Sequence, residues 1–139
     1  MKAINTKVSS KTLEKTKHEI IDIVAKSYNI DKRAERRFPF RTCMYLTNDD
    51  KKCAVGMFLT DEALKKSAKC LGDVRGLDVH LKARGFESLD SAFIKDVRGH
   101  EVGFWVDIQS LHDDNNFWNT EGLSKYGADY VHELKRRYD

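Results

Sequence analysis

The chain has little proline, with one residue in 139, and it contains no long hydrophobic run. Its longest apolar stretch, residues 54–59, falls far short of the roughly 20 residues that a helix needs to span a bilayer. The N-terminal residues include no apolar segment of the kind found in secretory signal peptides. Three cysteines are an odd number, which does not suit a framework of paired disulfides. These absences predict a cytoplasmic protein with reduced thiols and no membrane partner.

The sequence also lacks the common motifs of catalysis and nucleotide binding. Residues 72–76 begin and end with glycine, but the segment is too short for a phosphate-binding loop and lacks its lysine and hydroxyl. No Gly-x-Ser-x-Gly turn and no His-Glu-x-x-His helix is present. The motifs therefore favour a protein that is not an enzyme, and they imply no cofactor.

The composition is that of a folded globular protein. Hydrophobic residues make up 40% of the chain, charged residues make up 34%, and the net charge is +3. A length of 139 residues suits one domain. We expect a single domain over residues 1–139, with residues 1–9 as a disordered tail. The mild positive charge neither requires nor excludes a nucleic-acid partner.

Most of the chain is predicted to be helical. Hydrophobic residues recur at the three- and four-residue spacing of amphipathic helices, and Ser10, Thr60 and Asp90 are placed where N-terminal caps are needed. Residues 102–108 also alternate as a strand would, but the helical spacing continues to His112, so we expect a helix there. The expected helices cover residues 11–28, 61–71, 74–84, 90–97, 102–113 and 123–138.

One β-hairpin is expected between Cys43 and Cys53. Residues 48–50 (Asn-Asp-Asp) favour a turn, because these side chains bond to their own backbone and tolerate unusual dihedral angles. Tyr45 and Val55 suit the two flanking strands. The predicted fold class is therefore α+β, a single helix-dominated domain with one small β-hairpin.

The two cysteines of this hairpin are the first candidates for chemistry. Cys43 and Cys53 would face one another across the strands, and His112 and Asp113 are candidates for the third and fourth ligands of a metal ion. The spacing between the cysteines is wider than in a zinc knuckle. A catalytic Cys53 would need His112 as its base. We favour the interpretation that both thiols pack in the interior, and a metal site, a redox pair and a catalytic cysteine remain alternatives.

Gln109, His112 and Asp113 form a second candidate group. Gln109 and Asp113 are four residues apart and share one face of the expected helix, with His112 beside them. Such side chains can form a proton relay or a ligand site. They also suit an ordinary helix end, where a histidine meets the negative end of the helix dipole, and we favour this second interpretation.

A basic and aromatic stretch is the candidate surface for a partner. Arginine beside exposed aromatic rings is typical of single-stranded nucleic-acid sites, because the guanidinium group pairs with phosphate and the rings stack on bases. The same stretch suits an acidic protein surface, and the two rings could instead pack in the core. The candidate partner-binding residues are Arg33, Arg36, Arg37, Phe38, Phe40 and Arg41.

Several short motifs follow one another between residues 41 and 118. Arg41-x-Cys43-x-Tyr45 precedes residues 52–56 (Lys-Cys-Ala-Val-Gly), and residues 108–113 (Ile-Gln-Ser-Leu-His-Asp) precede a tryptophan. Together they resemble a pattern in small proteins of bacteriophages, prophages and some bacteria. The group has no established activity, so the resemblance implies a phage accessory protein and transfers no catalytic residue. The turn of this chain lacks the glycine that is usual in the group.

The predicted function is that of a non-enzymatic phage accessory protein that binds a host or phage macromolecule in the cytoplasm of a bacterial cell. A protein partner is favoured over a nucleic acid. Two alternatives stay open. One is a small metalloprotein or enzyme that uses Cys43, Cys53 and His112, and the other is a nucleic-acid-binding protein that uses the stretch from Arg33 to Arg41.

Overall fold

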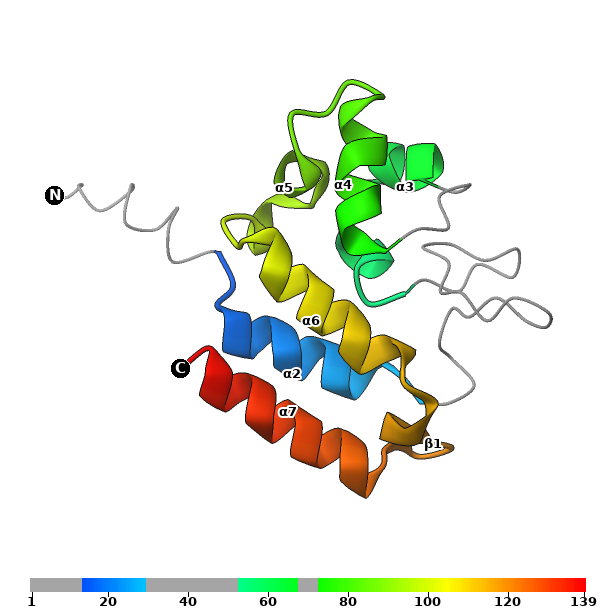
Figure 1. The fold of residues 1–139 in the computed structure, drawn as a ribbon, viewed down its shortest axis with the longest axis vertical. Helices are drawn as coiled ribbons and strands as arrows, with labels where there is room; N and C mark the ends of the chain where they lie inside the picture. Colours follow the sequence, from blue (N-terminus) through cyan, green and yellow to red (C-terminus); the bar gives the residue numbers. More distant parts are fainter. Residues whose placement is uncertain (1–13, 30–52, 68–72) are drawn as a thin grey trace, which may run out of the picture.

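The computed structural model describes residues 14–29, 53–67 and 73–139, and within these ranges the chain is dominated by helices (Figure 1). This confirms the predicted α+β class. Element labels follow Figure 1. The α-helices are α2 (Lys17–Ser27), α3 (Asp61–Ser67), α4 (Val74–Lys82), α5 (Leu89–Ala92), α6 (Val102–Asp113) and α7 (Lys125–Arg137). Short 3₁₀ turns are η1 (Gly56–Phe58), η2 (Lys95–Val97) and η3 (Asn115–Phe117), and the strands are β1 (Trp118–Asn119) and β2 (Gly122–Leu123).

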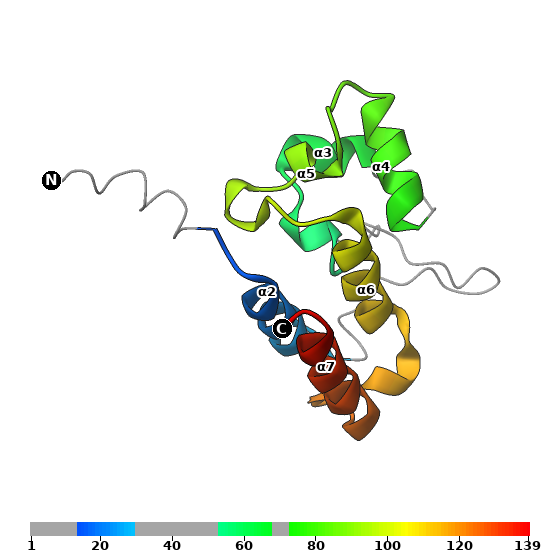
Figure 2. The ribbon, with the colours of Figure 1, turned by 60° about the vertical axis from the view of Figure 1, so that its left-hand side comes forward.

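The helices form two groups that share α6. Helices α2, α6 and α7 pack against one another on one side, and α3, α4 and α5 pack together near the beginning of α6 (Figures 1 and 2). One continuous core of buried side chains runs through both groups. Helix α6 therefore provides the central surface, and its largest buried side chains are Phe104, Trp105, Ile108 and Leu111. No described helix combines the length and the hydropathy that crossing a bilayer would require.

Helix α2 begins later than the sequence predicts. Its N-terminal cap is Thr16, whose side chain accepts from the Glu19 N–H while the Glu19 carboxylate accepts from the Thr16 N–H. This reciprocal pair satisfies backbone donors that the first helical turn leaves without partners. The expected start at residue 11 was thus wrong for residues 14–16, and the expected cap Ser10 lies outside the described residues.

Helix α3 confirms its predicted cap, and α4 confirms its predicted buried face. The Thr60 side chain accepts from the Ala63 N–H at the start of α3. Helix α4 buries Val74, Leu77 and Leu81, as their spacing predicts. The turn that follows α4 includes Gly85 at φ +100°, a backbone conformation that glycine adopts at little cost. The expected continuation of α3 over residues 68–71 lies outside the described part of the chain.

The helix expected over residues 90–97 is divided in two. Ser88, and not Asp90, caps α5, because the Ser88 side chain accepts from the Ser91 N–H. The Asp90 carboxylate instead accepts from the Gly99 N–H at 2.9 Å. Between α5 and η2 the chain is extended at Phe93, which forms a β-bridge with Leu59. The helix is interrupted here because these backbone groups pair with another segment.

The described hairpin is not the one that the sequence predicts. Residues after Cys53 form a turn and then η1, so the expected second strand at Val55 was wrong, and residues 41–52 lie outside the described ranges. The described sheet pairs Trp118 with Leu123 in antiparallel register. The Asn119 side chain accepts from two backbone N–H groups of the turn, and Gly122 has φ +141°. Leu123 is therefore a strand residue, and α7 begins two residues later than expected, with its cap at Ser124.

Candidate functional site

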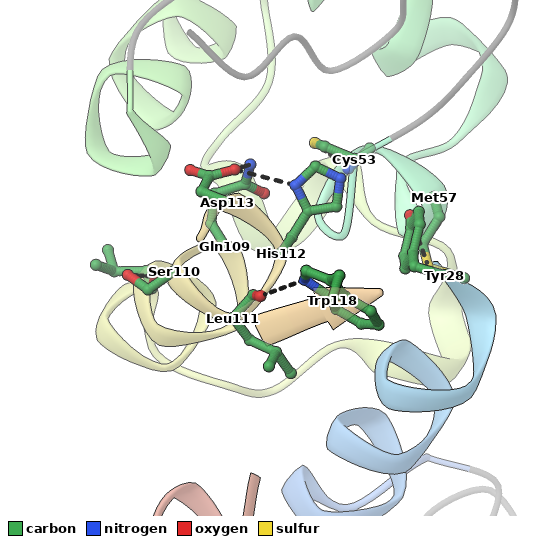
Figure 3. Close-up of polar contacts among 11 residues, drawn as sticks. Tyr28, Cys53, Met57, Gln109, Ser110, Leu111, His112, Asp113 and Trp118 are labelled. Carbon is green, nitrogen blue, oxygen red and sulfur yellow. Dashed lines mark hydrogen bonds and ion pairs between the residues drawn. The ribbon is translucent and has the colours of Figure 1, made fainter. Parts of the chain in front are cut away.

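The end of α6 brings buried polar side chains together. Among the described residues, the buried polar or charged side chains are Ser67, Gln109 and His112. Gln109 and His112 lie about one turn apart on α6. Both donate to Oδ1 of Asp113, Gln109 through Nε2 at 2.9 Å and His112 through Nδ1 at 3.0 Å (Figure 3). Because a carboxylate oxygen accepts, Nδ1 of His112 holds the proton, and in the neutral ring Nε2 is then an acceptor. Asp113 thus fixes the orientation and tautomer of a histidine that is 1% exposed.

Aromatic rings form a layer beside His112. The ring of Tyr28, at the end of α2, meets the imidazole edge-on with centroids 5.0 Å apart. Tyr28 also meets Trp118 of β1 at 6.0 Å, again edge-on. The indole N–H of Trp118 donates to the Leu111 carbonyl at 2.9 Å, which ties β1 to the last turn of α6. The end of α2 is therefore held by ring contacts against the end of α6 and β1, which lie more than 80 residues later in the sequence.

Cys53 is joined to this layer through Met57. The Tyr28 hydroxyl donates to the Met57 sulfur at 3.4 Å, and the Met57 N–H donates to the Cys53 carbonyl at 3.0 Å. The Cys53 side chain is fully buried, and its sulfur accepts from the Gly56 N–H at 3.2 Å. The thiol thus helps to close the turn that leads into η1. We call Tyr28, Cys53, Met57, His112 and Trp118 the Tyr28 layer (Figure 3).

Of the candidates for metal binding and catalysis, the structure describes Cys53, His112 and Asp113. Cys53 and His112 belong to the same layer, but the hydrogen bond to the Cys53 sulfur comes from backbone and not from the imidazole. Over residues 14–29, 53–67 and 73–139, no group of three or more His, Cys, Asp or Glu side chains is arranged to hold a metal ion. Cys43, the other proposed ligand, lies outside these ranges. Thiolate chemistry also requires access to the sulfur, and Cys53 is 0% exposed.

The proposed partner-binding residues Arg33, Arg36, Arg37, Phe38, Phe40 and Arg41 lie outside the described residues. Tyr28 and Cys53 precede and follow this stretch in the sequence, and both belong to the Tyr28 layer. The body of the protein therefore fixes the two points between which the basic and aromatic stretch is attached.

A second polar group lies at the other end of the α6–α7 contact. The carboxylate of Asp107 accepts from the Tyr138 hydroxyl and from Arg137 Nη1, the latter at 3.1 Å. Burial, followed by the hydrogen bond to Asp107, raises the pKa of Tyr138 well above its usual value. Lys17 of α2 lies over the rings of Phe104 and Tyr138 at 5.7 and 5.9 Å. These contacts attach the C-terminus to α2 and α6.

The sequence pointed to Gln109, His112 and Asp113 because they are neighbours on one helix. The sequence did not predict that Tyr28 and Met57 would lie beside them, because both residues fit the pattern of ordinary hydrophobic core positions. The contact between Tyr28 and His112 spans most of the chain, and single-sequence periodicity contains no information about such pairs.

Neither a protein-family model, nor a curated protein, nor a solved structure matches this chain.

Proposed function

We propose that this chain is a phage-encoded accessory protein that binds a host or phage macromolecule inside the bacterial cell and catalyses no reaction. We further propose that the contact is made by Arg33, Arg36, Arg37, Phe38, Phe40 and Arg41. The observation that supports this most is that Tyr28 and Cys53, which precede and follow these residues in the sequence, both belong to the Tyr28 layer. Binding segments are commonly attached to a rigid scaffold in this way. The phage origin rests on the sequence resemblance.

The burial of the side chains that could take part in catalysis supports a binding role over an enzymatic one. The Cys53 sulfur and the His112 ring are 0% and 1% exposed, and each contributes to closing the interior. Asp113 is the exposed member of the group, and its Oδ1 already accepts two hydrogen bonds. We therefore propose that the Tyr28 layer has a structural role, which is to hold in place the two ends of the segment that contains Arg33 to Arg41.

The charge distribution favours an acidic protein as the partner. Residues 30–52 contain seven Lys and Arg against four Asp and Glu, a net charge of +3, and the whole chain also has a net charge of +3. The rest of the chain is therefore neutral on balance. It adds no net positive charge for a long polyanion to follow, whereas a protein partner can match the basic stretch with a local acidic surface.

Affinity capture from a bacterial lysate, with and without nuclease, tests this proposal. The test variant replaces Arg33, Arg36 and Arg37 with alanine. The control variant replaces Lys65, Arg75 and Lys125 with alanine; these residues are exposed, and their side chains make no hydrogen bond or ion pair with other described residues. Both variants lose three positive charges, so a general charge effect would affect them equally.

The expected result is a nuclease-resistant protein partner that is captured by the wild type and the control variant and lost with the test variant. Equal capture by the test variant would reject the basic stretch as the contact. Loss with both variants would indicate a contact that depends on overall charge. Circular dichroism and the unfolding midpoint, unchanged in both variants, separate loss of contact from loss of fold.

One observation favours the metalloprotein or enzyme alternative. A carboxylate that fixes the tautomer of a histidine, as Asp113 does for His112, is common beside catalytic bases and metal ligands. Elemental analysis of the purified protein, compared with Cys53→Ser and His112→Gln variants, distinguishes the two functions. Stoichiometric zinc or iron in the wild type that is absent from both variants would reject our proposal in favour of the metalloprotein.

A further inference from the structure

We draw no further inference here: the strongest candidate, the aromatic surface at the start of α7 formed by exposed Tyr126 and, one turn later, by Tyr130 stacked on Phe117, is an apolar face, and nothing in the structure shows what covers it.

Discussion

Gly127 is predicted to tolerate no side chain, although it lies within a helix where alanine is normally preferred. A Cβ atom built at this position would lie 2.1 Å from the Phe117 carbonyl oxygen and 2.7 Å from Leu123 Cδ2. The same carbonyl accepts from the Ser124 N–H at 2.8 Å, so the hairpin that precedes α7 would have to move. Because β1 contributes Trp118 to the Tyr28 layer, this close approach also sets the position of that layer.

The magnitude follows from two opposing terms. Alanine is favoured over glycine inside a helix by about 1 kcal/mol. Overpacking of a well-packed site costs about 1–3 kcal/mol and more where backbone must shift, and relief of this contact requires a movement of roughly 1 Å to reach an ordinary separation. We expect Gly127→Ala to lower the free energy of unfolding by about 2 kcal/mol net. Gly103 of α6 is the matched control, since its nearest neighbour would be Arg75 Nη2 at 3.9 Å. Gly103→Ala is expected to stabilise by about 0.5–1 kcal/mol.

Urea unfolding followed by tryptophan fluorescence measures both effects, because Trp105 and Trp118 are 1% and 3% exposed and report on the core. The slope of the transition should remain constant, so that the midpoint alone reports the change in stability. In thermal unfolding, each kcal/mol corresponds to roughly 3–5 °C for a chain of this length. Equal midpoints for wild type and Gly127→Ala would refute the close packing of α7 on the hairpin, and so would a loss of similar size in Gly103→Ala.

Three further predictions test individual side chains. Asp113→Ala removes the acceptor that the buried side chains of Gln109 and His112 share. Because Asp113 is half-exposed, we expect the free energy of unfolding, measured in urea, to fall by about 1–2 kcal/mol. The control Asp114→Ala removes one hydrogen bond and should lower it by less than about 1 kcal/mol. Since burial and a hydrogen bond raise the pKa of Tyr138 in the folded state, its contribution to stability is complete below about pH 10 and is lost as pH rises further. Stability should therefore decline less above about pH 10 in Tyr138→Phe than in wild type or in Tyr126→Phe, whose ring is exposed, and identical profiles would contradict this. The Cys53 thiol should resist iodoacetamide until urea unfolds the protein, as measured by peptide mass spectrometry, and rapid native labelling would show an accessible sulfur.

Elements with long-range periodicity were predictable from the sequence. Helix α4 buries the three residues that its spacing indicates, and α6 is a helix although residues 102–108 also alternate. The choice between helix and strand at α6 was correct because the hydrophobic row continues through Leu111, beyond the alternating part. A hydrophobic face that repeats over three helical turns is therefore enough to distinguish a helix from a strand.

The hairpin was not predictable, because its strands are two residues long. A period of two cannot be recognised over such a length, and Asn119 with Gly122 is a less evident turn signal than residues 48–50. The cap of α5 illustrates a second limit. Ser88 and Asp90 are both good capping residues, and the choice depends on the Asp90 contact with Gly99 in a later loop.

The candidate site was predictable only in its local part. Gln109, His112 and Asp113 share one helical turn, so their proximity follows from the helix itself. The contacts that join Tyr28 and Cys53 to them are set by the packing of α2 and of the turn before η1 on α6. The sequence therefore identified the polar group, and the structure added the interior position that favours a structural role for it.

The distribution of charge leads to a quantitative distinction between the two classes of partner. If the five basic residues between residues 32 and 41 each met one phosphate, affinity would fall by roughly 250-fold between 50 and 200 mM salt, from a slope of about −0.8 per contact. An acidic protein surface gives a weaker dependence, because exposed ion pairs contribute only about 0–1 kcal/mol each and are screened within roughly 10 Å. A decrease of less than about tenfold over this range therefore favours a protein partner, and a decrease of two orders of magnitude would favour a nucleic acid.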